Sequence, residues 1–152
     1  DFALVDLEPA GLLTDAACLE AASGEPLSDE APLVQEVVCL RESPRRIDFR
    51  FGNYGRVNRH RIHIQITDQG GSRLGHRSLE AASLVDCAFV GVDLQGPARG
   101  GQLRVEIRSE GAQPGNEVLV WRAPDPGACL QVGDNHKSGE SVSFRVFSEM
   151  DS

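Results

Sequence analysis

Apolar and polar residues alternate along four stretches of this chain, and this period of two constrains the fold more than any other feature. In RIHIQI (residues 61–66) every second residue is isoleucine, and a similar alternation recurs at 46–51, 103–108 and 142–146. Successive side chains of a β-strand point to opposite faces, so each stretch predicts a strand with one buried face and one wet face. The side chains that we expect in the core are Ile47, Phe49, Ile62, Ile64, Val105, Ile107 and Phe144.

Shorter apolar runs at 33–40, 88–94 and 117–121 bring the number of predicted strands to about seven. Turn-forming sequences such as DQGG, QGPARGG and GDNHKSGE separate them. About seven to eight short antiparallel strands at this spacing predict an all-β fold, an antiparallel β-sandwich of jelly-roll type. We expect the stretch SLEAASLVD (78–86) to form a helical turn or a structured loop that crosses between the sheets.

The N-terminal part of the chain is acidic and lacks the alternation. It contains TDAACLEAA (14–22), which predicts a short helix with Thr14 or Asp15 as its cap. We therefore expect an acidic N-terminal segment or linker over residues 1–32, helical or irregular, and a β-sandwich domain over 33–152. Because the chain does not begin with methionine, we expect it to be a piece of a longer protein.

Charge is distributed unevenly along the 152 residues, whose formal net charge is −8. Residues 45–77 hold eight arginines and two aspartates, whereas the segments on both sides are acidic. A basic segment between acidic ones is either an anion-binding face or a set of partners for the acidic parts of the same chain. Arginine outnumbers lysine by 14 to one, which indicates a GC-rich genome, and we expect a bacterial source.

Signals for catalysis, cofactors or metals are absent from the sequence. It contains no GxSxG, GxxxxGK[ST] or GxGxxG motif. His60 and His63 form an HxxH pair, but positions i and i+3 of a strand point to opposite faces, so the pair cannot chelate one ion unless the strand begins after His60. We therefore predict no catalytic residue, no metal and no cofactor. An acidic chain with one Tyr and one Trp also argues against nucleic-acid binding.

Four widely spaced cysteines match no zinc pattern, and they are Cys18, Cys39, Cys87 and Cys129. We expect reduced thiols and a cytoplasmic location, with a disulfide as the alternative. No apolar run approaches the roughly 20 residues that span a bilayer, so we expect no membrane insertion.

A polar loop, GNYGRVNR, separates two of the predicted strands. If those strands are antiparallel neighbours, Arg50 lies near His63 and Asp48 lies near Gln65 on the wet face. The loop then presents a tyrosine for stacking on a sugar, together with amides and guanidinium groups that bind hydroxyls and carboxylates. The alternative is that the loop is only a polar bend. The candidate ligand-binding residues are Asn53, Tyr54, Arg56, Asn58 and Arg59.

The order of strands and loops resembles β-sandwich accessory domains found beside glycosyltransferase and other polysaccharide-biosynthesis domains in bacterial proteins. The resemblance covers roughly residues 33–149. The matching positions are Arg56, Asn58, Asp68, Leu84, Asp86, Ser109, Gly115, Asn116 and Trp121. It implies a non-catalytic module with a carbohydrate context and supplies no catalytic residues.

Three functions are compatible with these observations. The first is a module that binds a glycan or a glycosylated partner for a neighbouring domain of the parent protein, a glycosyltransferase by the resemblance. The second is a structural or oligomerisation module, for instance one that forms a homodimer, with no small-molecule ligand. The third, an enzyme with an unrecognised site, has no motif in its favour. Fold alone does not decide between them.

Overall fold

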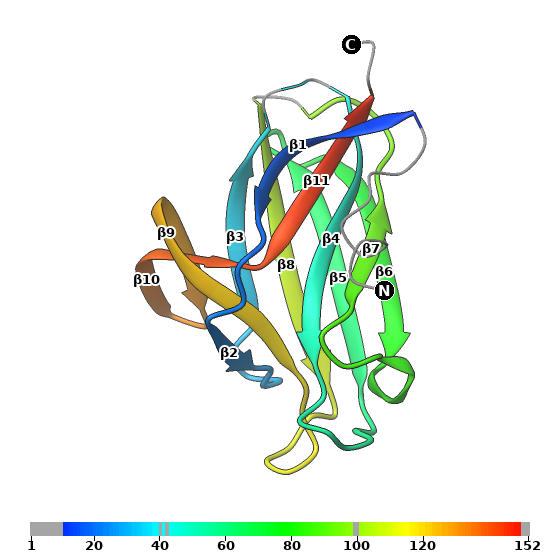
Figure 1. The fold of residues 1–152 in the computed structure, drawn as a ribbon, viewed down its shortest axis with the longest axis vertical. Helices are drawn as coiled ribbons and strands as arrows, with labels where there is room; N and C mark the ends of the chain where they lie inside the picture. The colour runs from blue at the N-terminus through cyan, green and yellow to red at the C-terminus, as the bar shows by residue number, and fades with distance from the viewer. Residues whose placement is uncertain (1–10, 40, 42, 99–100, 150–152) are drawn as a thin grey trace.

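The computed structural model describes residues 11–39, 41, 43–98 and 101–149, and this part of the chain is all-β (Figure 1). Eleven antiparallel strands form one open sheet in the order β1-β11-β4-β9-β3-β8-β5-β6, with β2 and β10 on β9 and β7 on β4. The strands are β1 Leu12–Cys18, β2 Ser23–Pro26, β3 Leu33–Val38, β4 Pro44–Gly52, β5 Arg61–Asp68, β6 Arg73–Glu80, β7 Phe89–Asp93, β8 Gln102–Glu110, β9 Leu119–Val132, β10 Asn135–Val142 and β11 Phe144–Glu149.

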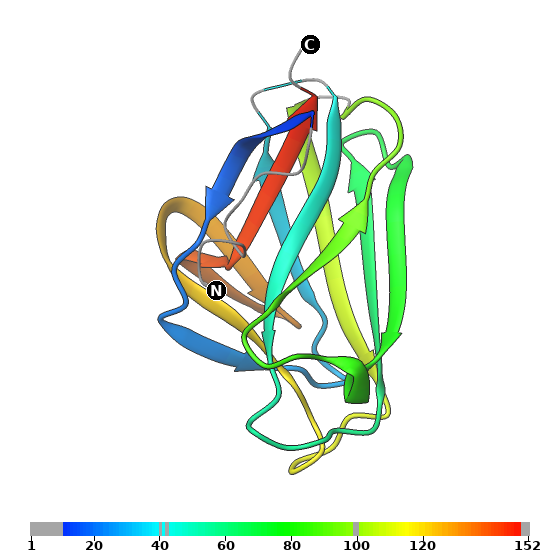
Figure 2. The same ribbon diagram turned by 45° about the vertical axis from the view of Figure 1, so that its right-hand side comes forward.

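Strand β4 links two parts of the sheet. Its residues 44–50 pair with β11 and β7, whereas Phe51 and Gly52 pair with β9. In both views β1, β11, β4 and β7 lie across the front of β3, β8 and β5 (Figures 1 and 2). One hydrophobic cluster contains side chains from both groups, among them Phe49 of β4 and Ile64 of β5. All seven side chains that the alternation predicted for the core are buried.

The predicted helix at 14–22 is wrong, because this stretch forms most of β1 and the irregular segment that follows it. Strand β1 pairs with β11, from Leu12 opposite Glu149 to Cys18 opposite Phe144. Pairing along an existing strand outweighs the helix propensity of a segment rich in Ala. Strand β2, which also precedes residue 33, pairs with β9. Residues 1–10 lie outside the described residues.

The described chain has more strands than the seven to eight predicted. Each predicted strand is present, and the four additional ones are β1, β2, β6 and β10. The stretch 78–86 contains the end of β6 and a 3-10 turn, η1 (Ala81–Ser83), so the expected helical turn is confirmed. None of the described segments forms a helix long and apolar enough to cross a lipid bilayer.

The predicted pairing of β4 with β5 is wrong. Strand β5 lies between β6 and β8, whereas the neighbours of β4 are β11, β7 and β9. The connection from β4 to β5 therefore crosses between two parts of the sheet instead of closing a hairpin. As a result Arg50 stacks on Phe89 rather than lying near His63, and Asp48 binds Arg145 rather than lying near Gln65.

All four cysteines are free thiols in the structure. Cys87 and Cys129 are exposed, and Cys39 is buried. Burial, with a smaller contribution from the nearby Asp15 carboxylate, raises the pKa of the Cys39 thiol to about 12. Cys39 is therefore protonated at neutral pH and packs as a small apolar side chain.

Candidate functional site

The loop between β4 and β5, residues 53–60, is called the rim loop here. It lies at the lower end of Figure 1, beside the loop between β8 and β9. The two loops are joined through Asn116, whose side-chain oxygen accepts a hydrogen bond from the Arg59 N–H (2.6 Å) and whose amide donates to the Arg59 carbonyl (3.1 Å). The rim loop is therefore fixed at both of its strand ends and along its side.

Asn53 and Asn58 build the bend of the rim loop. The Asn53 side-chain oxygen accepts the Gly55 N–H at 2.8 Å, and the Asn53 carbonyl accepts the Asn58 amide at 3.0 Å. The Asn53 N–H donates to the Asp86 carboxylate at 2.9 Å. Asn58 is 0% exposed. Both asparagines thus supply turn geometry, and Asn58 has no surface to offer a ligand.

Arg56 ties the rim loop to the start of the segment leading into β9. Its Nη2 donates to the Glu117 carboxylate at 2.5 Å and to the Glu117 carbonyl at 3.1 Å, and its Nε donates to Asn58 Oδ1 at 2.7 Å. This half-exposed guanidinium therefore has an ion-pair partner and two further acceptors. A ligand would have to compete with these internal bonds for Arg56.

Tyr54 is exposed on the rim loop that these hydrogen bonds hold in place. Its ring is 46% exposed, and the Arg56 guanidinium carbon lies 4.7 Å from the ring centroid. Its backbone φ of +59° lies in the left-handed region, which is uncommon for a bulky side chain. Burial and the Glu117 carboxylate raise the pKa of the Tyr54 hydroxyl, while Arg56 opposes the shift. The hydroxyl is therefore neutral at physiological pH and can both donate and accept.

The five predicted ligand residues all lie in this loop, but only Tyr54 and Arg59 are exposed. Arg59 is exposed, and its hydrogen bonds to Asn116 use its backbone only. Asn53, Arg56 and Asn58 hold the loop together. Much of the basic segment likewise pairs with its own chain, through Arg45–Glu149, Arg56–Glu117 and Arg61–Glu80.

Comparison of the sequence with protein families and with curated proteins finds no match.

A metal site is not formed within the described ranges 11–39, 41, 43–98 and 101–149, where no three His, Cys, Asp or Glu side chains gather in a suitable way. The HxxH pair has separate surroundings. His63 contacts Ser78 and Glu110 on the wet face of the sheet. His60 is buried just before β5 begins, with its Nδ1 3.1 Å from the Arg61 carbonyl.

Asp29, in the loop between β2 and β3, binds the end of β8 and the loop that follows β8. Its carboxylate accepts hydrogen bonds from Ser109 Oγ (2.7 Å), the Gly111 N–H (2.7 Å) and the Ala112 N–H (3.0 Å). These bonds, the Ser109 bond above all, lower the pKa of the Asp29 carboxyl below its ordinary value of 3.8. A carboxyl with a lowered folded-state pKa stabilises the fold above its unfolded pKa and loses that effect as the pH falls through the folded pKa.

We expect the amide resonances of Gly111 and Ala112 to titrate with a midpoint below pH 3.8, because both protons point at the Asp29 carboxylate. The measurement is a two-dimensional NMR titration from pH 6 to about 2, the range in which carboxyl groups titrate. The Asp29→Asn variant serves as the control, and both midpoints should vanish in it. A midpoint at or above 3.8 in the native protein would contradict this assignment.

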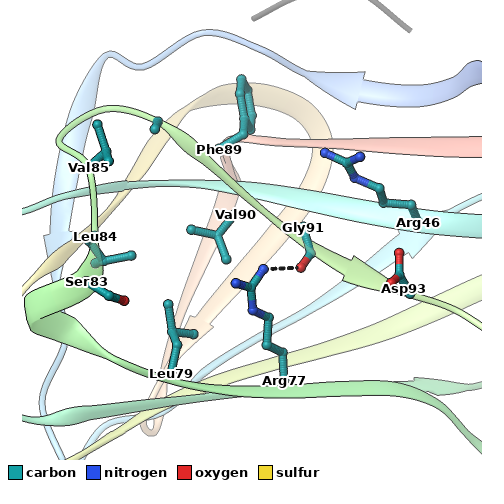
Figure 3. A pocket seen from close by; sticks show the side chains of 11 residues that line it. Arg46, Arg77, Leu79, Ser83, Leu84, Val85, Phe89, Val90, Gly91 and Asp93 are labelled. Carbon is teal, nitrogen blue, oxygen red and sulfur yellow. Dashed lines mark hydrogen bonds between the residues drawn. The ribbon is translucent and has the colours of Figure 1, made fainter. Parts of the chain in front are cut away.

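A second site was missed by sequence reasoning and lies where the edge strands β6 and β7 diverge (Figure 3). This seam pocket has a volume of about 450 Å³. Its lining is Arg46, Arg77, Leu79, Ser83, Leu84, Val85, Ala88, Phe89, Val90, Gly91 and Asp93. The pocket could not be predicted from the sequence, because β6 (RLGHRSLE) has a weak apolar pattern and was not predicted as a strand.

Proposed function

We propose that this chain is a non-catalytic module that binds an acidic oligosaccharide weakly at the rim loop. The observation that carries the proposal is Tyr54, an exposed aromatic ring held in the left-handed region on a loop that is hydrogen-bonded to Asp86 and Asn116. A left-handed conformation costs about 1–2 kcal/mol for an ordinary L-residue. Strained residues of this kind cluster at functional sites, which supports a role for the ring beyond packing.

The neighbours of Tyr54 suit a sugar acid. Arg56 lies over the ring, so the aromatic platform is already oriented before a ligand arrives. Arg59 supplies an exposed guanidinium on the same loop, and a guanidinium forks onto a carboxylate. The parent protein in this proposal is a bacterial polysaccharide-biosynthesis protein such as a glycosyltransferase, in keeping with the resemblance of residues 33–149.

We also propose that the open sheet is a sandwich of jelly-roll type. The crossing of β4 from β11 and β7 to β9, and the single core shared by both strand groups, support this assignment. In sandwiches the end loops are the usual place for binding residues, and the rim loop is such an end loop. Four free thiols support a reducing compartment, and we propose the cytoplasm.

The alternative is a structural or oligomerisation module without a small ligand. It is favoured by the internal use of Asn53, Arg56 and Asn58, three of the five residues predicted to bind. Asp86 and Asn116, on which the resemblance also rests, likewise hold the rim loop in place. In this alternative the rim loop is a rigid bend, and Tyr54 binds no ligand.

We expect oligosaccharides that contain uronic acids to bind to the native chain, and we expect the affinity to fall as salt is raised from about 50 to 500 mM, since exposed charges are screened. Tyr54→Asn should abolish this binding without lowering the melting temperature, because asparagine tolerates the left-handed region. Arg59→Gln should weaken it and remove most of the salt dependence. The measurement is a glycan array followed by calorimetry.

Arg108→Gln is a matched control, since Arg108 is an exposed arginine on β8 and the substitution removes the same charge. It should bind as the native chain does. Arg56→Ala is avoided because it would also break the bonds to Glu117 and Asn58. An array with no salt-sensitive acidic glycan, or binding that persists in Tyr54→Asn, would favour the structural module instead.

A further inference from the structure

Arg77 is an exposed arginine on the edge strand β6. It stands opposite Ile64 of β5, a fully buried residue, and shares its face of β6 with Gly75 and Leu79. Its Nη1 reaches across the seam and donates to the Gly91 carbonyl of β7 at 2.8 Å (Figure 3). No carboxylate of the described chain forms an ion pair with it. The hydrogen bond thus fixes a cation whose charge is not neutralised.

The seam between β6 and β7 is closed on one side of Arg77 and open on the other. On the closed side the Gln95 N–H donates to the Leu74 carbonyl at 2.8 Å. A Cβ on Gly75 would come within 2.4 Å of the Asp93 carbonyl oxygen, so the backbones are in close contact there. On the open side the chain turns through η1, and the seam pocket fills the space.

The seam pocket has an apolar end and a charged end. Leu79, Leu84 and Val90 line the apolar end and are only partly buried, and Val85 is 72% exposed. The charged groups are Arg46, Arg77 and Asp93, which lie toward the other end in Figure 3. Arg46 is already bound to Asp48 through two hydrogen bonds, of 2.6 and 3.1 Å.

A backbone donor faces the pocket beside Arg77. In an antiparallel strand the N–H and C=O of one residue point to the same side. The Gly91 carbonyl points toward Arg77 and away from β4, so the Gly91 N–H points to that side as well. Strand β7 pairs only with β4, which leaves this N–H without a strand partner among the described residues. A guanidinium and a backbone N–H side by side form a cradle for an anion.

We propose that the seam pocket binds a carboxylate that carries an apolar group. The carboxylate lies between the Arg77 guanidinium and the Gly91 N–H, and the apolar group packs against Leu79, Leu84 and Val85. A singly charged carboxylate fits this site better than a phosphate, because the pocket holds one unneutralised arginine and also the Asp93 carboxylate. The volume of about 450 Å³ lies within the usual range for small-molecule sites.

This pocket is separate from the rim loop, and the proposal does not depend on sugar binding there. The ligand chemistry has two natural sources, a free aliphatic acid and the apolar C-terminal residue of a peptide. The probes are therefore sodium octanoate, used below its micellar concentration, and a short peptide that ends in leucine, with its C-terminal amide for comparison. Octanol tests the contribution of the carboxylate.

In an NMR titration of the native chain, we expect octanoate to shift the amide resonances of Gly91 and Leu79 and to bind at least tenfold more tightly than octanol. If the peptide acid binds more tightly than octanoate, and its amide does not, the natural ligand is a chain terminus. If octanoate binds more tightly, it is a free acid. Equal affinities of octanoate and octanol would overturn the proposal, and this comparison needs no variant.

Arg77→Gln should lower the affinity for octanoate at least fivefold and leave that for octanol unchanged. Arg73→Gln is the matched control, because Arg73 is an exposed arginine on the same strand but does not line the pocket. The melting temperature of both variants is measured, since Arg77→Gln also alters the bond between β6 and β7. If the two variants bind octanoate equally well, Arg77 only closes the seam and the proposal fails.

Discussion

Replacement of Ile64 by aspartate is expected to leave the chain unfolded at 25 °C. Ile64 is fully buried at the centre of β5, opposite Ile107 of β8. The substitution removes about 1.5–3 kcal/mol of apolar burial. It also places a carboxylate where no water can reach it, at a further cost of several kcal/mol. Together these losses approach the roughly 5–15 kcal/mol by which a domain of this kind is stable.

The measurements are near-ultraviolet circular dichroism, which reports the packing of Trp121, and a thermal melt. Ile64→Asp should show no near-ultraviolet signal and no cooperative transition. Gln65→Asp is the control, because this neighbour is exposed and its new carboxylate stays hydrated. It faces Glu106 across the strand pair, so it should cost at most about 1 kcal/mol. A cooperative melt in Ile64→Asp would mean that β5 is not central to the core.

The strands that could be predicted are those in which one face is buried and the other is wet. In β5 the alternation of isoleucine and polar residues matches the alternation of buried and exposed positions in the structure. Strand β1 could not be predicted in this way, because TDAACLEAA favours a helix locally and becomes a strand only by pairing with β11. Strand β6 was missed since it lies at an edge, where polar residues are tolerated on both faces.

The candidate site was predicted in composition but not in geometry. The amides and arginines of GNYGRVNR do form one compact loop, yet their partners come from the distant residues Asp86, Asn116 and Glu117. Local sequence cannot show which polar groups of a loop are hydrogen-bonded to such distant residues and which are left to bind a ligand. The seam pocket is harder still to predict, because it exists only through the positions of β6, at one end of the strand order, and β7, which pairs with β4 alone.

A buried carboxylate on the outer face of β4 is the clearest departure from the alternation. Asp48 was expected on the wet face and is 0% exposed. It accepts hydrogen bonds from Arg46 Nε (2.6 Å) and Arg145 Nε (2.7 Å). Arg145 is itself buried and lies 4.1 Å from the Phe89 ring centroid and 5.2 Å from that of Phe147. Arginines and aromatic rings of three neighbouring strands thus cover the carboxylate.

Asp48→Ala is expected to destabilise the chain by about 3–5 kcal/mol, the usual cost of removing one partner from a buried ion pair. The substitution takes the carboxylate away from Arg145, a buried cation that was desolvated in its presence. The measurement is the free energy of unfolding from urea denaturation. A loss below about 1 kcal/mol would show that Asp48 is not an energetic anchor of this face.

Two further variants separate the charge from the packing. Asp48→Leu combined with Arg145→Met should recover most of the stability lost in Asp48→Ala, because apolar side chains of similar size often replace a buried ion pair at little cost. Gly91→Ala leaves both charges in place, but its Cβ would lie 2.7 Å from Arg46 Nε and 2.8 Å from Asp48 Oδ1. It should therefore destabilise the chain through displacement of Arg46. If the double variant were as unstable as Asp48→Ala, packing rather than charge pairing would govern this face of β4.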